Sequence, residues 1–326
     1  MNRRLFTFSL CSIFFFLSIL NVCAQANVKP VETKITNGVI DARLYLPDKN
    51  AGYNRGSRFD WAGVINDLKY KGHTYFGQWI DTYSPTSHDA VMGPVEAFDP
   101  VGYNEAKPGE VFIKIGIGAL IKPDDSVYNF MKTYAILNHG KWKIKSTSNQ
   151  VKFFQTLKEE EYAYEYQKNI QLKKHQPVMV ISHTLKNTGN KIIETSVYDH
   201  NFFVIDQQPT GPGFVVTFPN DLNENLDGME TYVSIKNNQL IFLKELKNKH
   251  ISFKDLTNGK GAAYSIKIEN QKTGAGVKIT GDHPISKLAF WSSSKTLCPE
   301  PYIKVKAKPG EEVNWKITYE YYTISN

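Results

Sequence analysis

The sequence has very little cysteine: its 326 residues include three, Cys11, Cys23 and Cys298. The first two lie in an N-terminal segment that we expect to be removed, so the exported chain keeps Cys298 alone and forms no internal disulfide. Its stability must then come from a large hydrophobic core. Neither a His-Glu-x-x-His nor a Gly-x-Ser-x-Gly motif occurs, which removes the usual starting points for a zinc enzyme or a serine hydrolase. We predict no metal and no cofactor.

Long apolar runs are also scarce. One stretch, residues 5–22, follows Arg3 and Arg4 and leads into Ala24-Gln25-Ala26. A charged start, an apolar middle and a small-x-small end predict a signal peptide over residues 1–26 and argue against an integral membrane span. We therefore expect export to the periplasm as a soluble protein, with secretion as a less favoured alternative.

The end of this segment allows a second alternative. Leu20-Asn21-Val22-Cys23 is similar to a lipoprotein signal, in which the cysteine receives a lipid. Val22 stands where a small residue is usual before the lipidated cysteine. We therefore favour soluble export over lipidation of Cys23.

A strong charge of one sign is missing as well. Lysine and arginine total 39 against 32 aspartates and glutamates, which gives a formal charge of +7. Removal of residues 1–26 takes away Arg3 and Arg4 and no acid, so the mature charge falls by two. This weak and dispersed charge argues against nucleic acid as a partner.

Helical periodicity is absent from the mature chain, because no window carries a sustained apolar stripe with a period of 3.6 residues. Apolar and polar residues instead alternate with a period of two, which predicts strands. No linker or repeat divides residues 27–326. We expect one all-β domain there, a sandwich of mostly antiparallel strands in two stacked sheets. The clearest predicted strands cover residues 111–121, 140–154, 162–172, 178–185, 192–204 and 313–323.

Two segments carry candidate acid–base residues. His200 lies in Ser196-Val197-Tyr198-Asp199-His200-Asn201-Phe202-Phe203, between strand-like residues and before paired aromatics. Glu300 lies between Pro299 and Pro301, which hold the backbone extended and stiff around its carboxyl. Each has a simpler interpretation: a hydrogen-bonded strand histidine for His200, and an edge-strand device for Glu300.

These segments resemble the aldose 1-epimerase, or galactose mutarotase, superfamily. In that family an Asn-His-x-Tyr-Phe type motif carries a catalytic histidine, and a later Cys-Leu-Glu-Pro type motif carries a catalytic glutamate. Here the matching segments are Asp199-His200-Asn201-Phe202-Phe203 and Cys298-Pro299-Glu300-Pro301. Asn54-Arg55-Gly56-Ser57-Arg58-Phe59 is similar to the family segment whose arginine binds sugar hydroxyls. Asp199 stands for the family asparagine and Phe202 for the tyrosine, and the family's His-Gly-Gly segment is absent.

The resemblance implies a galactose mutarotase-like β-supersandwich that binds a sugar or glycan and interconverts sugar anomers. It implies that Glu300 takes the proton of the C1 hydroxyl while His200 protonates the ring oxygen. This chemistry needs Glu300 ionised and His200 charged, a combination that we expect their opposite charges to favour.

The polar and aromatic region 53–98 is expected to supply the substrate-binding residues. We predict that Arg58, Trp61, His73 and Glu96 gather near His200, with His73 favoured over His88. Long loops over a sandwich also need polar residues for their own backbone, so a structural role is the alternative for each of these residues.

Two other functions stay open. Another sugar-active enzyme, a polysaccharide lyase or an isomerase, uses paired acid and base groups on the same kind of scaffold. A non-catalytic glycan-binding protein would keep the aromatic and arginine residues. The basic residues Lys244, Lys247, Lys249, His250 and Lys254 also suit an acidic glycan, although we favour a solvated loop for them.

Overall fold

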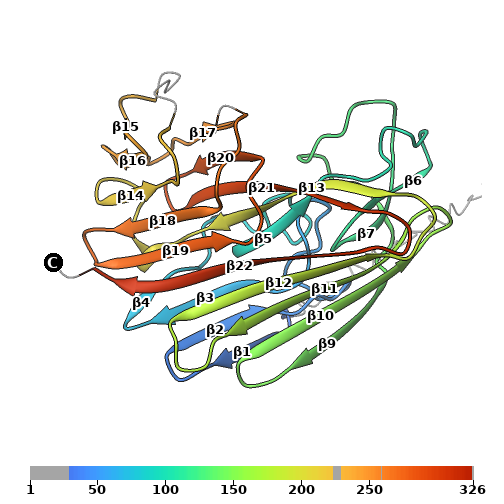
Figure 1. Ribbon diagram of the computed structural model, residues 1–326, viewed down its shortest axis with the longest axis horizontal. Coiled ribbons are helices and arrows are strands. Elements are labelled where there is room, and N and C mark those ends of the chain that lie inside the picture. Colours follow the sequence, from blue (N-terminus) through green and yellow to red (C-terminus); the bar gives the residue numbers. More distant parts are fainter. Residues whose placement is uncertain (1–28, 223–228, 258, 325–326) are drawn as a thin grey trace, which may run out of the picture.

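The computed structural model describes residues 29–222, 229–257 and 259–324. The predicted signal peptide, with Cys11 and Cys23, lies outside these residues. Within the described part, strands β1 to β22 and one short 3₁₀ turn, η1 (Ile205–Gln207), make up the regular structure (Figure 1). Every pairing among these strands is antiparallel. The all-β, antiparallel prediction is therefore confirmed.

The largest layer is a ten-stranded sheet. It runs from the β15 edge at the upper left of Figure 1 to the β9 edge at the lower right. β22, the last strand of the chain, lies near the middle of this sheet. In spatial order its strands are β15 (Val233–Lys236), β16 (Gln239–Phe242), β14 (Phe214–Thr217), β18 (Ser265–Asn270), β19 (Ala275–Gly281), β22 (Glu312–Thr323), β12 (Val178–Asn187), β11 (Ala163–Leu172), β10 (Gln150–Lys158) and β9 (Lys141–Ser146).

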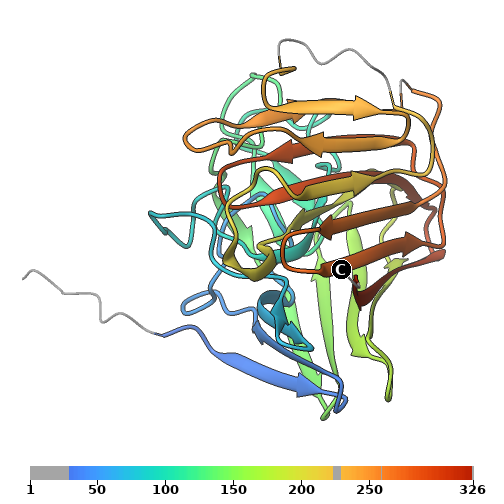
Figure 2. The same cartoon turned by 90° about the vertical axis from the view of Figure 1, so that its left-hand side faces the viewer.

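Three smaller sheets complete the architecture, and Figure 2 shows them from the side. The five-stranded sheet, which carries the candidate catalytic residues, has the order β17 (Ile251–Phe253), β20 (Lys287–Ser292), β21 (Leu297–Ala307), β13 (Ile193–Phe202) and β5 (Gly93–Phe98). The four-stranded sheet contains β1 (Glu32–Thr36), β2 (Ile40–Tyr45), β3 (Val64–Tyr70) and β4 (His73–Thr74), and the three-stranded sheet contains β6 (Val111–Lys114), β7 (Gly118–Ile121) and β8 (Ile136–Asn138).

The main core lies between the ten-stranded and five-stranded sheets. Phe98 of β5 packs edge-on against Tyr166 of β11 and Trp315 of β22, at ring-centre distances of 5.6 and 6.1 Å. Alternation along β22 explains this, since Trp315, Ile317, Tyr319 and Tyr321 are buried while the residues between them are more exposed. Period-two patterning thus aims one apolar face of each sheet at the other.

Two predicted strands are wrong in length. Residues 111–121 form the hairpin of β6 and β7, because Gly116 and Gly118 adopt φ angles of +79° and +144° and reverse the chain between them. Residues 140–154 form β9 and the first part of β10, which pair as neighbours across a turn at residues 147–149. Residues 145–150 are all polar, and Gly116 and Gly118 stand two residues apart, so the sequence carries turn signals that the strand prediction did not use. That residues 27–326 form one domain stays a prediction.

Candidate active site

His200 and Glu300 are cross-strand neighbours in the five-stranded sheet. Tyr198 of β13 pairs with Tyr302 of β21, and the isolated bridge beyond joins Phe203 to Leu297. Both pairs have the same register, which sets His200 opposite Glu300. Phe203 and Leu297 exchange both backbone hydrogen bonds. Hydrogen-bonded and non-hydrogen-bonded pairs alternate along an antiparallel ladder, so His200 and Glu300, three positions away, form a non-hydrogen-bonded pair, in which side chains lie closest.

Two prolines shape the strand that carries Glu300. The register sets Pro299 opposite Asn201 and Pro301 opposite Asp199, at positions where an N–H would donate to β13. Proline has no N–H, so the ladder lacks these bonds. The Asn201 side-chain amide compensates, since it donates to the carbonyl oxygen of Pro299 at 3.0 Å and to that of Asp199 at 3.2 Å.

The pocket-facing side of this sheet forms one wall of a cavity of about 560 Å³. On β13 and β21 the lining residues are all of one parity, as the pleat requires. Ala97 of β5 and Ala289 of β20, on the strands that flank β13 and β21, leave room for a ligand. The volume falls within the range of small-molecule sites. The wall presents the side chains of Tyr198, His200, Phe202, Trp291, Glu300 and Tyr302.

Aromatic rings hold the His200 imidazole. It stacks on Phe202 at 3.9 Å between ring centres, and Phe59 meets it edge-on at 5.5 Å. Its Nε2 lies 3.3 Å from Oε1 of Glu300. Its Nδ1 is buried and has no hydrogen-bond partner among the described residues. The imidazole is therefore fixed by stacking, with one nitrogen directed at the carboxyl group.

Burial determines the protonation of this pair. It raises the pKa of Glu300 to about 7, although the positive charges of Arg58 and Lys287 act in the opposite direction. It lowers the pKa of His200 well below the ordinary value, and the Arg58 charge adds to this effect. The two groups thus share one proton below about pH 7, and Glu300 holds it. The expected charged pair is corrected to a neutral one, because desolvation of both charges outweighs their attraction.

Arg58 is the predicted binding residue that the structure brings to this pair. Its guanidinium donates to the Tyr198 hydroxyl at 3.1 Å and forms an ion pair with Asp89 at 3.0 Å. It also lies between the rings of Phe59 and Phe130, with its central carbon 4.4 and 4.2 Å from their centres. Arg58 is 9% exposed and lines the cavity. His88, which we had ranked below His73, also lines it.

The predicted positions of Trp61 and His73 are wrong. Trp61 packs in a separate aromatic cluster with Tyr103 and Phe112, and its indole N–H donates to the carbonyl oxygen of Gly56 at 2.8 Å. His73 lies on β4, at the edge of the four-stranded sheet, with its Nδ1 2.9 Å from Asp206. Neither lines the cavity. Both are polar aromatic residues with structural partners, and composition alone does not reveal such partners.

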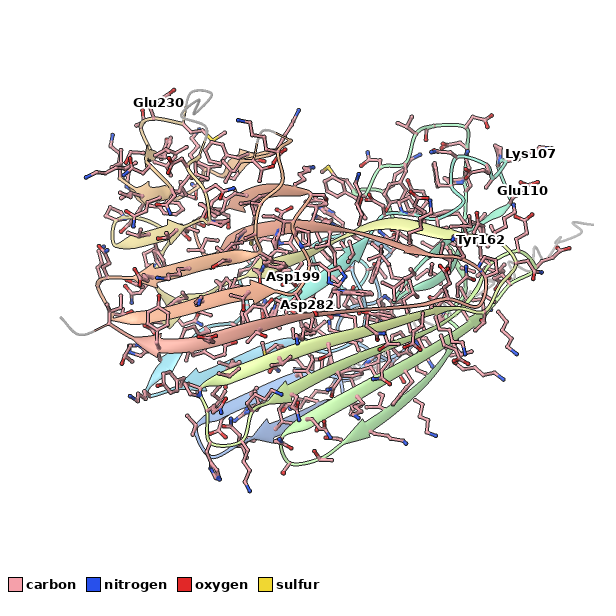
Figure 3. The ribbon with its side chains drawn as sticks, viewed as in Figure 1. Lys107, Glu110, Tyr162, Asp199, Glu230 and Asp282 are labelled. Atoms are coloured by element: carbon pink, nitrogen blue, oxygen red, sulfur yellow. The ribbon has the colours of Figure 1, made fainter. Side chains whose placement is uncertain are left out.

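The predicted position of Glu96 is also wrong, and the pleat explains why. Glu96 pairs with Asp199 on the face of the sheet that points into the interior, whereas its neighbour Ala97 faces the cavity. The Glu96 carboxylate binds the Lys168 ammonium and lies 2.7 Å from Nε2 of His183. These neighbours lower its pKa to about 2 despite burial. Figure 3 labels Asp199, near the middle of the molecule.

A buried polar network therefore backs the cavity wall. Lys168 donates to the Ala62 carbonyl oxygen at 3.0 Å, and Tyr166 donates to Asp60 at 3.0 Å. These bonds tie the segment that follows Arg58 to the ten-stranded sheet. Tyr319, from the same sheet, donates to Asp199 and lies 2.9 Å from Oδ1 of Asn201. The network thus joins the ten-stranded sheet both to the segment that follows Arg58 and to β13, the strand of His200.

Sequence reasoning missed Lys168 and His183, although a signal was present. Lys168 interrupts the inward series of Tyr164, Tyr166, Ile170 and Leu172, and His183 interrupts a similar series on β12. A charged or titratable residue at a core-facing strand position needs a buried partner. The sequence analysis also missed Tyr198 and Tyr302, which lie two residues from His200 and Glu300 on the same face of the sheet.

Neither a metal cluster nor a membrane helix emerges from the described residues. They contain no group of three or more histidine, cysteine or acidic side chains placed to hold a metal ion. Across the same ranges, no helix combines the length and apolarity needed to cross a membrane.

Several solved structures share the fold of this chain at low sequence identity. No family model and no curated protein matches the sequence. A putative aldose 1-epimerase from Escherichia coli K12 shares 13% identity and a TM-score of 0.54, over 90% of this chain and 99% of its own. A galactose mutarotase related enzyme from Lactobacillus acidophilus gives 12% and 0.55, over 91% and 99%. An aldose epimerase homologue from C. elegans gives 13% and 0.53, over 91% and 100%. The chain thus has the predicted galactose mutarotase-like β-sandwich fold.

Proposed function

We propose that this protein is a carbohydrate-active enzyme of the aldose 1-epimerase type, which interconverts the anomers of a sugar. The observation that carries the proposal is the 3.3 Å approach of His200 Nε2 to Glu300 Oε1 in the wall of an aromatic-lined cavity. Ring opening needs one group that accepts the C1 hydroxyl proton and one that protonates the ring oxygen. A pair that shares one proton meets both needs.

The proton of the resting pair lies on Glu300, and its transfer to His200 gives the reactive form. Glu300 then takes the proton of the C1 hydroxyl while His200 protonates the ring oxygen. The bond between C1 and the ring oxygen breaks, the C1–C2 bond rotates, and reclosure with the reverse proton transfers delivers the other anomer. Each group ends in its starting state, so the reaction needs no cofactor.

The remaining side chains of the cavity support a sugar ligand. Arg58, held by Asp89 and two aromatic rings, is placed to bind hydroxyl groups with its guanidinium. Trp291 offers an aromatic surface for the apolar face of a sugar ring. Tyr198 and Tyr302, stacked at 4.5 Å, add two hydroxyl groups.

Anomer exchange on a panel of hexoses, pentoses and uronic acids, followed by NMR or polarimetry, tests the proposal. Glu300→Gln and His200→Asn should each reduce the rate by about a hundred- to ten-thousandfold, because they keep size and polarity but remove the proton chemistry. Glu194→Gln, on the same strand as His200 but exposed, and His283→Asn are the matched controls. A wild-type protein that accelerates no sugar would reject the proposal.

The same panel separates the alternatives. A polysaccharide lyase would release an unsaturated product, seen by ultraviolet absorbance. A binding protein would hold a sugar equally well after Glu300→Gln.

We also propose that the enzyme acts outside the cytoplasm, because residues 1–26 have the pattern of a signal peptide. N-terminal sequencing of the protein from a periplasmic fraction should find a chain that begins near Asn27. An intact Met1 terminus in the cytoplasmic fraction would contradict it.

A further inference from the structure

The cavity holds more positive charge than the proposed reaction requires. Its lining includes four cationic side chains, those of Arg58, Lys114, Lys254 and Lys287, and three carboxyl groups. Asp89 is committed to Arg58, and Glu300 belongs to the acid–base pair. Asp99 is thus the one remaining carboxyl for three lysines. None of these lysines forms an ion pair within the described ranges.

Lys114 is the least satisfied of these cations. It ends β6, is 2% exposed, and faces the cavity. Its ammonium donates to the Tyr128 hydroxyl at 3.0 Å, the one hydrogen bond found for it in the described part of the chain. An ammonium can donate three. Burial lowers its pKa to about 7, with Asp99 acting against this and Arg58 adding to it. A buried cation with a single neutral partner favours the arrival of an anion.

Lys287 lies on the same wall as the catalytic pair. It pairs with Tyr302 across β20 and β21, and Ala289, two residues on, pairs with Glu300. Lys287 and Glu300 are therefore diagonal neighbours on the cavity face, which are about 7–8 Å apart in an antiparallel sheet. The Lys287 ammonium rests over the Tyr302 ring at 4.4 Å. Asp99 lines the same cavity. Burial raises its pKa, and the positive charges of Lys114 and Lys287 act in the opposite direction.

Positive charge continues to the mouth of the cavity. The edge strand β17 sets Ser252 opposite Trp291 of β20, so Ser252 and Lys254 point toward the cavity side of the sheet. His250 and Lys254 are exposed and belong to the basic segment 244–254 that the sequence singled out. His250 and Lys254 therefore form part of the cavity rim. The earlier expectation of a solvated loop does not hold for these two residues.

We propose that the sugar of this site carries a negative group, a carboxylate, sulfate or phosphate, bound by Lys114 and Lys287. The inference rests on the proposed function for the position of the sugar ring at His200 and Glu300. It goes beyond it in naming acidic sugars as the substrate class. The anion supplies the partner that the two ammonium groups lack, and the basic rim attracts it from solution.

Calorimetric binding and anomer exchange on matched sugars test this inference. Glucose is compared with glucuronic acid, glucose 6-sulfate and glucose 6-phosphate, and galactose with galacturonic acid. We expect at least one acidic member to bind about tenfold or more tightly than its neutral counterpart, with a preference that weakens as salt is raised. The three glucose derivatives distinguish the kinds of anion.

Lys287→Gln and Lys114→Met should each reduce that preference about tenfold, measured as the ratio of acidic-sugar to neutral-sugar affinity in the same variant. Lys267→Gln, exposed on β18 and remote from the lining, is the control for a lost charge. Equal binding of acidic and neutral sugars, or an unchanged preference in Lys287→Gln, overturns the inference and leaves the proposed function standing. If acidic sugars bind through Lys287 but no sugar exchanges anomers faster, the inference stands and the proposed function fails. Absence of all binding overturns both.

Discussion

The side-chain amide of Asn201 donates a hydrogen bond to the carbonyl oxygen of Pro299, 98 residues away in the sequence, at 3.0 Å. This bond joins the strand of His200 to the strand of Glu300 at the point where proline removes a rung of the backbone ladder. A second bond of the same amide, to the Asp199 carbonyl oxygen, lies on the other side of His200. Asn201 is therefore a positioning residue for the acid–base pair.

Asn201→Ala should lower the free energy of unfolding by about 1–3 kcal/mol, because two buried carbonyl oxygens lose their donor. It should also reduce the rate constant of anomer exchange, since the His200–Glu300 spacing is no longer fixed, while KM changes less. Urea unfolding and steady-state kinetics on the same preparation measure both effects. Asn169→Ala, a half-buried strand asparagine outside the cavity lining, is the control. A variant with normal kinetics would rule out the positioning role.

The rate of anomer exchange should fall as the pH rises through about 7. Burial raises the pKa of Glu300 to about 7, so the single proton of the pair is present below this pH and lost above it. The pKa of His200 is lowered, so a second proton enters the pair at a pH well below 6.5. A rate measured from pH 5.5 to 9 on a neutral sugar should therefore show one descending limb near neutrality.

Lys287→Gln provides a direct check on the cause of that limb. The Lys287 charge acts to lower the pKa of Glu300, so its removal should move the midpoint to higher pH, whereas Lys267→Gln should leave the midpoint in place. A rate that stays constant to pH 9 in the wild-type protein would show that Glu300 is not the group that titrates.

Lys168→Met should destabilise the fold by about 3–5 kcal/mol, because it leaves the Glu96 carboxylate buried without its main cationic partner. Lys306→Met, which breaks the exposed pair of Lys306 with Glu194, should leave stability nearly unchanged. Urea denaturation of the two variants measures the difference. Equal midpoints would contradict the view that Lys168 neutralises Glu96.

Ala289→Leu should block the sugar without touching an acid or a base. Ala289 pairs with Glu300 and faces the cavity, so three added carbons occupy ligand space. We expect KM to rise by roughly tenfold or more, with a small change in thermal midpoint. Ala135→Leu, exposed in a loop, adds the same volume elsewhere. An unchanged KM for Ala289→Leu would place the sugar away from this wall.

Strand patterning made the fold accessible from sequence, and two motifs drew attention to the candidate pair of His200 and Glu300. Period-two alternation predicted the strands, and the stiff frame of Pro299 and Pro301 singled out Glu300. The sequence pattern could not predict which loop residues face the cavity, because that depends on contacts between segments far apart in the chain. Trp61 and His73 found structural partners instead. Glu96 was assignable in principle, since Phe98 of the same parity is a core residue.

The protonation of the pair was not predictable from sequence. Opposite charges in a cleft favour an ion pair only while solvent or further charges offset the cost of desolvation. The side chains of His200 and Glu300 are buried, with 3% and 8% of their surface exposed. This burial depends on the aromatic rings of Phe59, Trp79 and Trp291, which come from segments distant in the sequence. The sequence shows that these rings exist but not that they enclose His200.

The shared register of β13 and β21 limits how this protein can diverge. A one-residue deletion in β13 before Asp199 would turn the following side chains to the opposite face, so that Asn201 would take the place of His200 in the cavity and the imidazole would enter the core. A compensating deletion in β21 would restore the pairing of the two strands, but the side chains that should face the cavity would still face the core. Insertions and deletions are therefore expected in the segments between β13 and β21 and excluded from the strands themselves. Among distant relatives, the length of chain that joins the two motifs can drift while the strand positions of the histidine and the glutamate stay fixed.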